Sequence, residues 1–357
     1  MFLAWKEIWY SKGRYSLIIG IIFLISYLVF FLTGLAYGLA QDGRLAADKW
    51  EATGIILSKE SDNNLNLSQF SDQDFKDVSA TNKAILLQKA SIAQLQEKPH
   101  TKANVSLFGI NRQQFIAPNI TKGEMFKNDH EVVISNRLAK QSHFKLHNKF
   151  KLTGSNEVFT IVGMTNDAMF NVAPVIYMSQ AAFNNVFGTT NSPNINAIVV
   201  RDKDHKLNNI KIKNDKLEAY TMPAFINNLP GYSAQVMTFE LMIGSLIIIS
   251  AVILGIFIYI LTIQKKHIFG VMKVQGISSG FIAKSVIMQT FILSLIGVLL
   301  GACLTMITQM FLPAAMPFNM NSFFYISISL LMVIFAVAGS LFSIRSIVKI
   351  DPLDALS

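Results

Sequence analysis

The chain has 357 residues, of which 52% are hydrophobic and only 15% are charged. About a quarter of the residues of a soluble domain are normally charged, so this composition excludes a purely soluble protein and places part of the chain in lipid. The one cysteine, Cys303, excludes an internal disulfide framework and offers no paired-cysteine metal or redox motif.

The net charge of +9 comes mainly from the flanks of the apolar stretches. Nine basic residues lie there against three acidic ones, so the flanks account for six of the nine net charges. Basic residues gathered at span ends indicate membrane topology, and we therefore expect no nucleic-acid partner. The basic residues are Lys6, Lys12, Arg14, Lys265, Lys266, Lys273, Lys284, Arg345 and Lys349.

The first forty residues predict a cytoplasmic amphipathic helix followed by a membrane span. Residues 1–14 place Trp5, Trp9 and Tyr10 between basic residues, which is typical of a helix at the inner membrane surface. Residues 15–40 carry no charge and are long enough to cross the bilayer. This run exceeds the roughly 7 to 15 apolar residues of a signal peptide, so we expect an uncleaved first span.

Residues 41–238 predict an extracellular α+β domain with stalk extensions, inserted between the first and second spans. Charged residues return here, and period-two alternation appears. Strands are predicted at 52–57, 104–108, 131–135, 150–152, 158–162, 175–178 and 197–201, and helices at 82–96 and 179–187. The sequence Thr-Gly-Ser-Asn at 153–156 predicts a hairpin turn.

The rest of the chain predicts three further spans, at residues 239–263, 285–311 and 323–344. Residues 312–322 interrupt a long uncharged run and predict a short outer loop. The basic segments 264–284 and 345–357 are expected on the cytoplasmic side. The fold class is therefore a membrane α-helical protein of four spans, with both termini cytoplasmic and its large domain extracellular.

The cytoplasmic segment 264–284 has a pattern of its own. Ile268, Val271, Met272 and Val274 lie roughly on one helical face, and Gly276 ends the helix. A short amphipathic helix of this kind can dock a soluble partner. A plain basic loop accounts for the pattern equally well.

Motifs for enzymatic chemistry are absent from the sequence. It contains no G-x-x-x-x-G-K-[ST] phosphate loop, no H-E-x-x-H and no nucleophile elbow. We expect a non-enzymatic subunit without a cofactor of its own. His143 and His147 would share a face if 136–147 were helical, but without a third ligand nearby a solvated face is favoured over a metal site.

A second group of polar and aromatic residues marks the outer ends of the first two spans. Its members are Tyr37 and Arg44 after the first span and Tyr232, Met237, Phe239 and Glu240 before the second. Tyrosine, methionine and carboxylate groups can ligate heme iron, and arginine pairs with propionates. Aromatic residues and snorkelling arginines also populate membrane interfaces without any ligand, so both interpretations stay open.

The layout and several motifs resemble the permeases of FtsX/MacB-type ABC transporters. The motifs are KKHIFGVMKVQGISSGFIAKS at 265–285, IRSIVKIDPLDALS at 344–357 and, in the outer domain, FGINRQQF at 108–115, GEMF at 123, EVVISNRLA at 131 and FTIVGM at 159. The N-terminal run from Trp5 to Ala40, with DKWEAT at 48, further resembles the permeases of Gram-positive heme exporters.

This resemblance implies a homodimer in the bacterial plasma membrane, in which each permease binds a soluble ABC ATPase through residues 264–284. The implied docking residues are Lys265, Lys266, Ile268, Phe269, Met272 and Gly276. It also implies mechanotransmission, in which closure at the ATPase is passed along the first two spans and heme is expelled from the outer part of the membrane. Glu240 is carried over first as a heme-site residue, within Met237-Thr238-Phe239-Glu240, and Arg44 second; Tyr37, Tyr232 and Tyr177 rest on chemistry alone.

Two alternatives remain at this stage. The same machinery could export a peptide antibiotic or a lipid-linked molecule, which would need no iron ligand. An FtsX-like regulator of a cell-wall hydrolase would bind a protein through its outer domain and would not respond to heme.

Overall fold

The computed structural model describes residues 12–98, 100–188, 195–202 and 206–348, which form two compact units. The sheet domain comprises Leu39–Val236 together with Pro313–Pro317, and the helical unit comprises the other described residues. The predicted helix at 1–14 falls almost wholly outside the described residues, as does the Asp351-Pro352 pattern of the tail.

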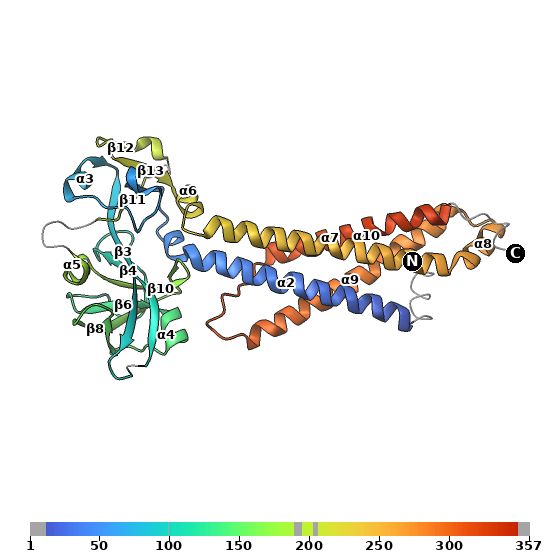
Figure 1. The fold of residues 1–357 in the computed structure, drawn as a ribbon, viewed down its shortest axis with the longest axis horizontal. Coiled ribbons are helices and arrows are strands. Elements are labelled where there is room, and N and C mark those ends of the chain that lie inside the picture. Colours follow the sequence, from blue (N-terminus) through green and yellow to red (C-terminus); the bar gives the residue numbers. More distant parts are fainter. Residues whose placement is uncertain (1–11, 99, 189–194, 203–205, 349–357) are drawn as a thin grey trace. The chain divides into compact units, whose positions relative to one another are not determined.

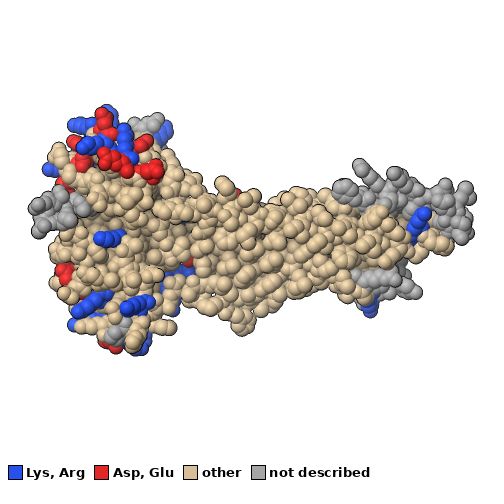
Figure 2. Space-filling model, in the orientation of Figure 1, with Lys and Arg blue, Asp and Glu red and all other residues tan. Residues whose placement is uncertain are grey.

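Four helices in the described part of the chain are long and apolar enough to cross a membrane, which confirms the prediction of four spans. They are α2 (Lys12–Asp48), α7 (Tyr232–Gln264), α9 (Ser279–Phe311) and α10 (Ser322–Val348) (Figure 1). In the face of the molecule shown in Figure 2, charged residues gather on the sheet domain and leave most of the helical unit uncharged. Helices α2 and α7 extend beyond the apolar runs that predicted them.

Small residues allow close helix approach inside the helical unit. A side chain at Gly297 or Gly301 of α9 would come within 2.6 Å of Ile22 or 2.7 Å of Ser26 on α2. A side chain at Gly339 of α10 would lie 2.4 Å from the backbone oxygen of Ala251 on α7. The pairs α2–α9 and α7–α10 therefore pack backbone against backbone, as small residues permit in membrane helices.

The sheet domain contains, among its described residues, one mixed sheet of eleven strands in the order β13-β1-β11-β3-β4-β10-β6-β8-β5, with β7 paired to β3 and β8, and β9 paired to β10. The strands are β1 (Gly54–Ser58), β3 (Asn82–Leu95), β4 (Lys102–Ile110), β5 (Ile120–Gly123), β6 (Glu131–Ser135), β7 (Lys149–Leu152), β8 (Val158–Thr165), β9 (Met169–Phe170), β10 (Ala173–Ser179), β11 (Ala197–Arg201) and β13 (Leu217–Thr221). The pairs β4–β10 and β6–β8 are parallel.

Shorter elements complete the domain. A separate two-stranded sheet joins β2 (Val78–Ser79) to β12 (Lys211–Ile212). The helices are α3 (Asp72–Lys76), α4 (Asn136–Ser142), α5 (Gln180–Phe187) and α6 (Met222–Asn227), with 3-10 turns at Lys59–Ser61 and Leu207–Asn209.

Both faces of the large sheet are covered by apolar cores. On β10, Ile176 and Met178 enter one core, whereas Val175 and Tyr177 enter the other. This division follows from the period-two alternation of side chains along a strand. Central strands buried on both faces explain why β10 is almost continuously apolar.

Most predicted elements of this domain are found. Strands β6 and β11 match their predicted bounds, Ser179 caps α5 by accepting from the Ala182 amide, and the turn at 153–156 joins the antiparallel strands β7 and β8. The helix predicted at 82–96 is wrong, because this segment is β3. Its Ala, Leu, Lys and Gln residues favour a helix locally, but pairing with β11 and then with β4 overrides that propensity.

Candidate functional site

The last turns of α2 are built into the sheet domain. Ala46, Ala47 and Trp50 are buried in the same core as Tyr177. The Trp50 ring lies 5.8 Å from that of Phe108 on β4, measured between ring centroids. This end of α2 is therefore part of the domain core and not a linker.

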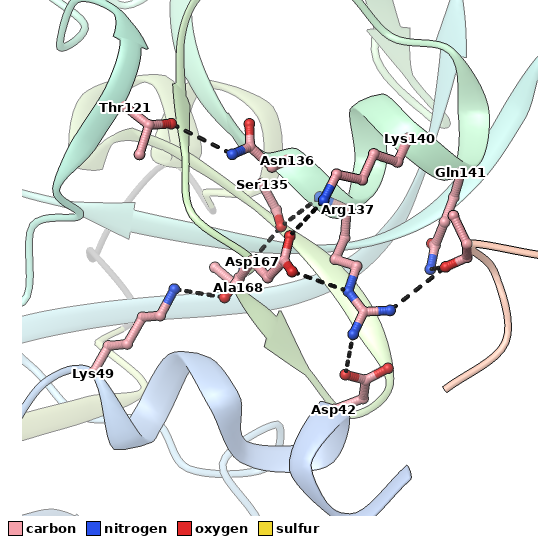
Figure 3. A network of polar contacts seen from close by, with 11 residues as sticks. Asp42, Lys49, Thr121, Ser135, Asn136, Arg137, Lys140, Gln141, Asp167 and Ala168 are labelled. Atoms are coloured by element: carbon pink, nitrogen blue, oxygen red, sulfur yellow. Dashed lines mark hydrogen bonds and ion pairs between the residues drawn. The ribbon is translucent and has the colours of Figure 1, made fainter. Parts of the chain in front are cut away.

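A polar network around Arg137 of α4 binds the same end of α2 (Figure 3). The guanidinium pairs with Asp42 of α2 at 3.3 Å and with Asp167 at 3.5 Å. It also donates to the backbone oxygen of Ala314 at 3.5 Å, and Gln141 donates to the same oxygen at 3.3 Å. One arginine thus joins α2, the segment after β8 and the loop that follows α9.

Backbone contacts reinforce this attachment. The amides of Asn171 and Val172, between β9 and β10, donate to the carbonyl oxygens of Gly43 at 3.0 Å and Asp42 at 3.2 Å. Both donors have a positive φ, 49° for Asn171 and 61° for Val172. A β-branched residue in this region is strained by about 1–3 kcal/mol. We attribute the persistence of this strained backbone conformation to the two hydrogen bonds that the turn donates to α2.

Of the predicted heme-site residues, Arg44 and Tyr232 lie in the sheet domain. Arg44 pairs with Asp48 at 3.2 Å, and both side chains are partly exposed. The ring of Tyr232, at the start of α7, lies against α2 because Gly43 has no side chain; a Cβ there would be 3.2 Å from the ring. The structure therefore places Tyr232 beside the residue that precedes Arg44.

Three other predicted site residues lie where α7 enters the helical unit. Met237 and Glu240 are exposed, and Phe239 is half-buried. Within the described residues, the Glu240 carboxylate has no hydrogen bond and no ion pair. Met237 and Glu240 are three residues apart and share one face of α7.

The remaining two tyrosines are engaged elsewhere. The Tyr37 hydroxyl accepts a hydrogen bond from Asn321 at 3.1 Å, and its ring lies 5.5 Å from that of Phe324 on α10. Tyr177 is 2% exposed and contacts Phe108 edge to face, and burial raises the pKa of its hydroxyl. A ligand role for Tyr177 would require this core to open.

The two histidines considered as metal ligands do not share a helical face. Helix α4 ends at Ser142, and both His143 and His147 adopt left-handed backbone conformations with φ of 58° and 66°. The conditional helix at 136–147 is therefore wrong, and the metal alternative loses its geometric basis.

The segment 264–284, which the sequence predicts to be cytoplasmic, contains α8 (Lys266–Val274), and Gly276 follows this helix with a φ of 88°. The predicted docking residues divide into two groups. Lys266 and Ile268 are exposed, Ile268 to 57%, whereas Phe269 is buried and Met272 is half-buried. The ammonium of Lys265 is directed at the Tyr15 hydroxyl of α2. Gly276 is exposed as well, so Lys266, Ile268 and Gly276 are the predicted docking residues that present a surface to a partner.

Sequence reasoning missed Asp42 and Arg137. Asp42 is the first acidic residue after the uncharged first span, and a carboxylate there requires a partner once it is buried. That signal was present in the sequence. Nothing in the sequence, however, identifies a partner 95 residues away.

Comparison with known proteins now becomes informative. The profile of the FtsX-like permease C-terminal family matches residues 240–352. These residues are therefore similar in sequence to an FtsX-like permease domain. The match begins at Glu240 and includes α8, α9 and the described part of α10.

Full-length relatives extend this result. A Staphylococcus haemolyticus protein is 28% identical over 360 residues, covering all of this chain and 99% of its own length. A Staphylococcus epidermidis protein is 27% identical over 365 residues with the same coverage. Both are provisionally named hemin transport system permease protein HrtB.

One solved structure is similar to the chain at a low level. The periplasmic region of MacB from Actinobacillus actinomycetemcomitans aligns with 48% of this chain and 88% of its own chain, at 12% identity and a TM-score of 0.35. This score is too low to assign a fold, so the architecture of the sheet domain rests on its own topology.

Proposed function

We propose that this chain is the permease subunit of an ABC-type exporter that expels heme from the outer part of the membrane. The observation that carries the proposal is the similarity, over the whole chain, to proteins named as hemin transport permeases. ATP would be hydrolysed by a separate soluble subunit. Two permease chains and two ATPase subunits would form the working complex in the plasma membrane.

The proposed orientation places both termini in the cytoplasm and the sheet domain outside the cell. Lys265, Lys266 and Lys273 lie at or in α8, and Lys284 is in the second turn of α9. Basic residues at these positions favour the cytoplasmic side. The exposed face of α8 around Ile268 would then receive the ATPase.

The proposed heme site is centred on Glu240, with Met237 on the same face of α7. The Glu240 carboxylate is exposed and has no partner among the described residues, and with the neighbouring Met237 thioether it offers two groups that can ligate iron. Arg44 would pair with a propionate. Its present ion pair with Asp48 is surface-exposed and contributes only about 0–1 kcal/mol, so a propionate can displace it at little cost.

Tyr232 and Phe239 have supporting parts in this proposal. Tyr232 is eight residues before Glu240 on α7, which makes it a capture residue and not a co-ligand of the same iron. Phe239 would contact the porphyrin ring through its half-buried side chain. Tyr37 would first have to release its hydrogen bond with Asn321, and Tyr177 would first have to leave the core of the sheet domain.

Heme titration into purified permease, followed in the Soret region, tests the proposal. Glu240→Ala should weaken heme binding by at least roughly tenfold, as loss of one ligand or charged contact does, and should abolish protection of cells against heme. Arg44→Ala should weaken binding by a few-fold and leave the iron spectrum similar. Glu97→Ala, an exposed glutamate of the sheet domain, is the matched control.

The outcomes also separate the alternatives. Absence of a Soret change with the wild-type chain would contradict heme as cargo and would leave another substrate of the same machinery, or a regulator of a cell-wall hydrolase. Heme binding that is unaffected by both substitutions would move the site away from Glu240 and Arg44.

A further inference from the structure

A buried polar cluster joins three segments of the helical unit. Tyr15, in the first turns of α2, is 1% exposed. Its hydroxyl accepts a hydrogen bond from the ammonium of Lys265 at 2.6 Å and another from the side-chain amide of Gln289 on α9. The Lys265 nitrogen also lies 5.3 Å from the centroid of the Tyr15 ring. The cluster therefore links α2 and α9 to the residue between α7 and α8.

Lys265 occupies the bend between these two helices. Its φ and ψ of −100° and 9° depart from helical values, so α7 ends before it and α8 begins after it. Its amide donates to the Thr262 oxygen of α7 at 3.2 Å, and its own oxygen accepts from the Phe269 amide of α8 at 3.0 Å. A tilt of α8 must therefore turn the backbone at Lys265, whose side chain holds Tyr15.

Packing between α2 and α7 is open at this same end. A cavity of about 570 Å³ lies between them and is lined by Leu17, Ile18, Phe257, Ile260, Leu261 and Gln264. This cavity is an open groove at the surface of the helical unit, because Leu17 and Ile260 are 55% and 44% exposed, while Ile18 and Leu261 beside them are buried. The neighbouring α2–α9 pair, in contrast, is closed by Gly297 and Gly301. At this end the polar cluster adds a directional link to the apolar core that Tyr15 and Ile18 share with Ile258 and Leu261 of α7.

We infer that Lys265 is a positioning residue that passes the displacement of α8 to α2 through the Tyr15 hydroxyl, and that it does not contact the ATPase. The inference rests on the proposed function, because α8 is taken as the docking helix. A charge-assisted hydrogen bond in a poorly hydrated site is stronger than one in water. Removal of the Tyr15 hydroxyl takes this acceptor away from the Gln289 amide and breaks the link from Lys265 to α2. Gln289 holds the same hydroxyl on α9, so α2 and α9 receive the displacement together.

The first test removes one oxygen atom from the complex of permease and ATPase. Tyr15→Phe keeps the ring and deletes the acceptor, and Tyr259→Phe, at an exposed position of α7, is its control. We expect wild-type co-purification of the ATPase and wild-type heme affinity. Protection of cells should nevertheless fall roughly tenfold, measured as the heme concentration that halves growth. Full protection by Tyr15→Phe, or loss of the ATPase, would overturn the inference.

A second pair of variants separates positioning from docking. Lys265→Arg retains a charged donor and should keep most of the protection, whereas Lys265→Met should lose it with the ATPase still bound. Lys284→Met, an exposed lysine on α9, is the control. If Lys265→Met releases the ATPase, Lys265 is a docking residue and the inference fails.

A third measurement does not depend on the cargo. In a Cys303→Ala background, spin labels at Leu17 and Ile260 report the distance between α2 and α7 across the cavity. A non-hydrolysable ATP analogue added to the complex should shift this distance in the wild-type sequence, and the shift should be absent or broadened with Tyr15→Phe. An identical shift in both would refute the role of Tyr15, whatever substrate is exported.

Discussion

The two ends of α2 are held in different ways. In the sheet domain, the helix contributes Ala46 and Ala47 to the core, pairs Asp42 with Arg137 and accepts two backbone hydrogen bonds from the strained turn before β10. In the helical unit, the Tyr15 end packs in an apolar core with α7 and α9, adjoins an open groove of about 570 Å³, and accepts hydrogen bonds from Lys265 and Gln289. The Asp42 end is therefore attached to the sheet domain, whereas the Tyr15 end is linked by its hydroxyl to the residue that precedes α8.

This difference between its two ends would allow α2 to transmit motion. An element that transmits motion needs one end fixed to what it moves and the other end coupled to what drives it. The Asp42 end meets the first requirement within its own unit, and in the proposed mechanism the Tyr15 end would meet the second through Lys265 and α8. Conformational changes in proteins commonly use such rigid elements with localised joints.

The largest expected effect comes from removing the ion pair that attaches the Asp42 end of α2 to the sheet domain. Arg137→Met leaves Asp42, whose side chain is 4% exposed, without its charged partner. Removing one member of a buried pair typically costs about 3–5 kcal/mol. We expect a matching loss in the free energy of unfolding, measured by denaturant titration in detergent. Replacing Trp5 and Trp9 by Phe makes Trp50, beside this site, the only tryptophan and hence the reporter.

Two controls make this prediction specific. Arg112→Met removes an exposed arginine of the same domain and should leave stability within about 0.5 kcal/mol of wild type. Combining Arg137→Met with Asp42→Asn removes the stranded charge and should recover part of the loss. A cost for Arg137→Met as small as that for Arg112→Met would show that this end is not fixed by the ion pair.

The second largest expected effect tests α8, which the proposal couples to the Tyr15 end of α2. Ile268→Asp introduces a charge on the exposed face of α8 and should weaken ATPase binding by about 2–3 kcal/mol, roughly 30- to 150-fold in affinity. Because Ile268 is exposed, the permease should still reach the membrane at normal levels. Gln275→Asp, an exposed position at the end of α8, is the control. Co-purification of the ATPase is the measurement, and a normal yield with Ile268→Asp would place the contact elsewhere.

The smallest effect tests the strained turn against α2. Val172 has a φ of 61° and is 44% exposed, so Val172→Gly relieves strain while losing little apolar burial. We expect a gain of about 0.5–1 kcal/mol in the free energy of unfolding, read from the same Trp50 fluorescence. Gln96→Gly, at an exposed position without positive φ, should not stabilise the domain. A loss of stability with Val172→Gly would mean that the valine side chain itself holds the turn.

Much of the fold could be predicted because its signals are local. The four spans are uncharged runs of the length that a bilayer requires, and this requirement acts on each segment independently. Strands such as β6 and β11 and the Ser179 cap of α5 also depend on residues next to one another in the chain. The segment 82–96 failed because β11 and β4 fix it as β3, and its partners lie far along the chain.

The candidate site likewise has one part that the sequence predicts and another that depends on tertiary packing. The sequence by itself determined the chemical types at the outer ends of the first two spans, since Asp42 and Arg44 follow the first span and Glu240 begins the second. Only the tertiary structure decided that Tyr177 is a core residue, that Asp42 meets Arg137, and that Tyr15 meets Lys265 and Gln289. Burial and polar pairing depend on which distant segments pack together, and the free energy that selects those partners belongs to the folded chain as a whole.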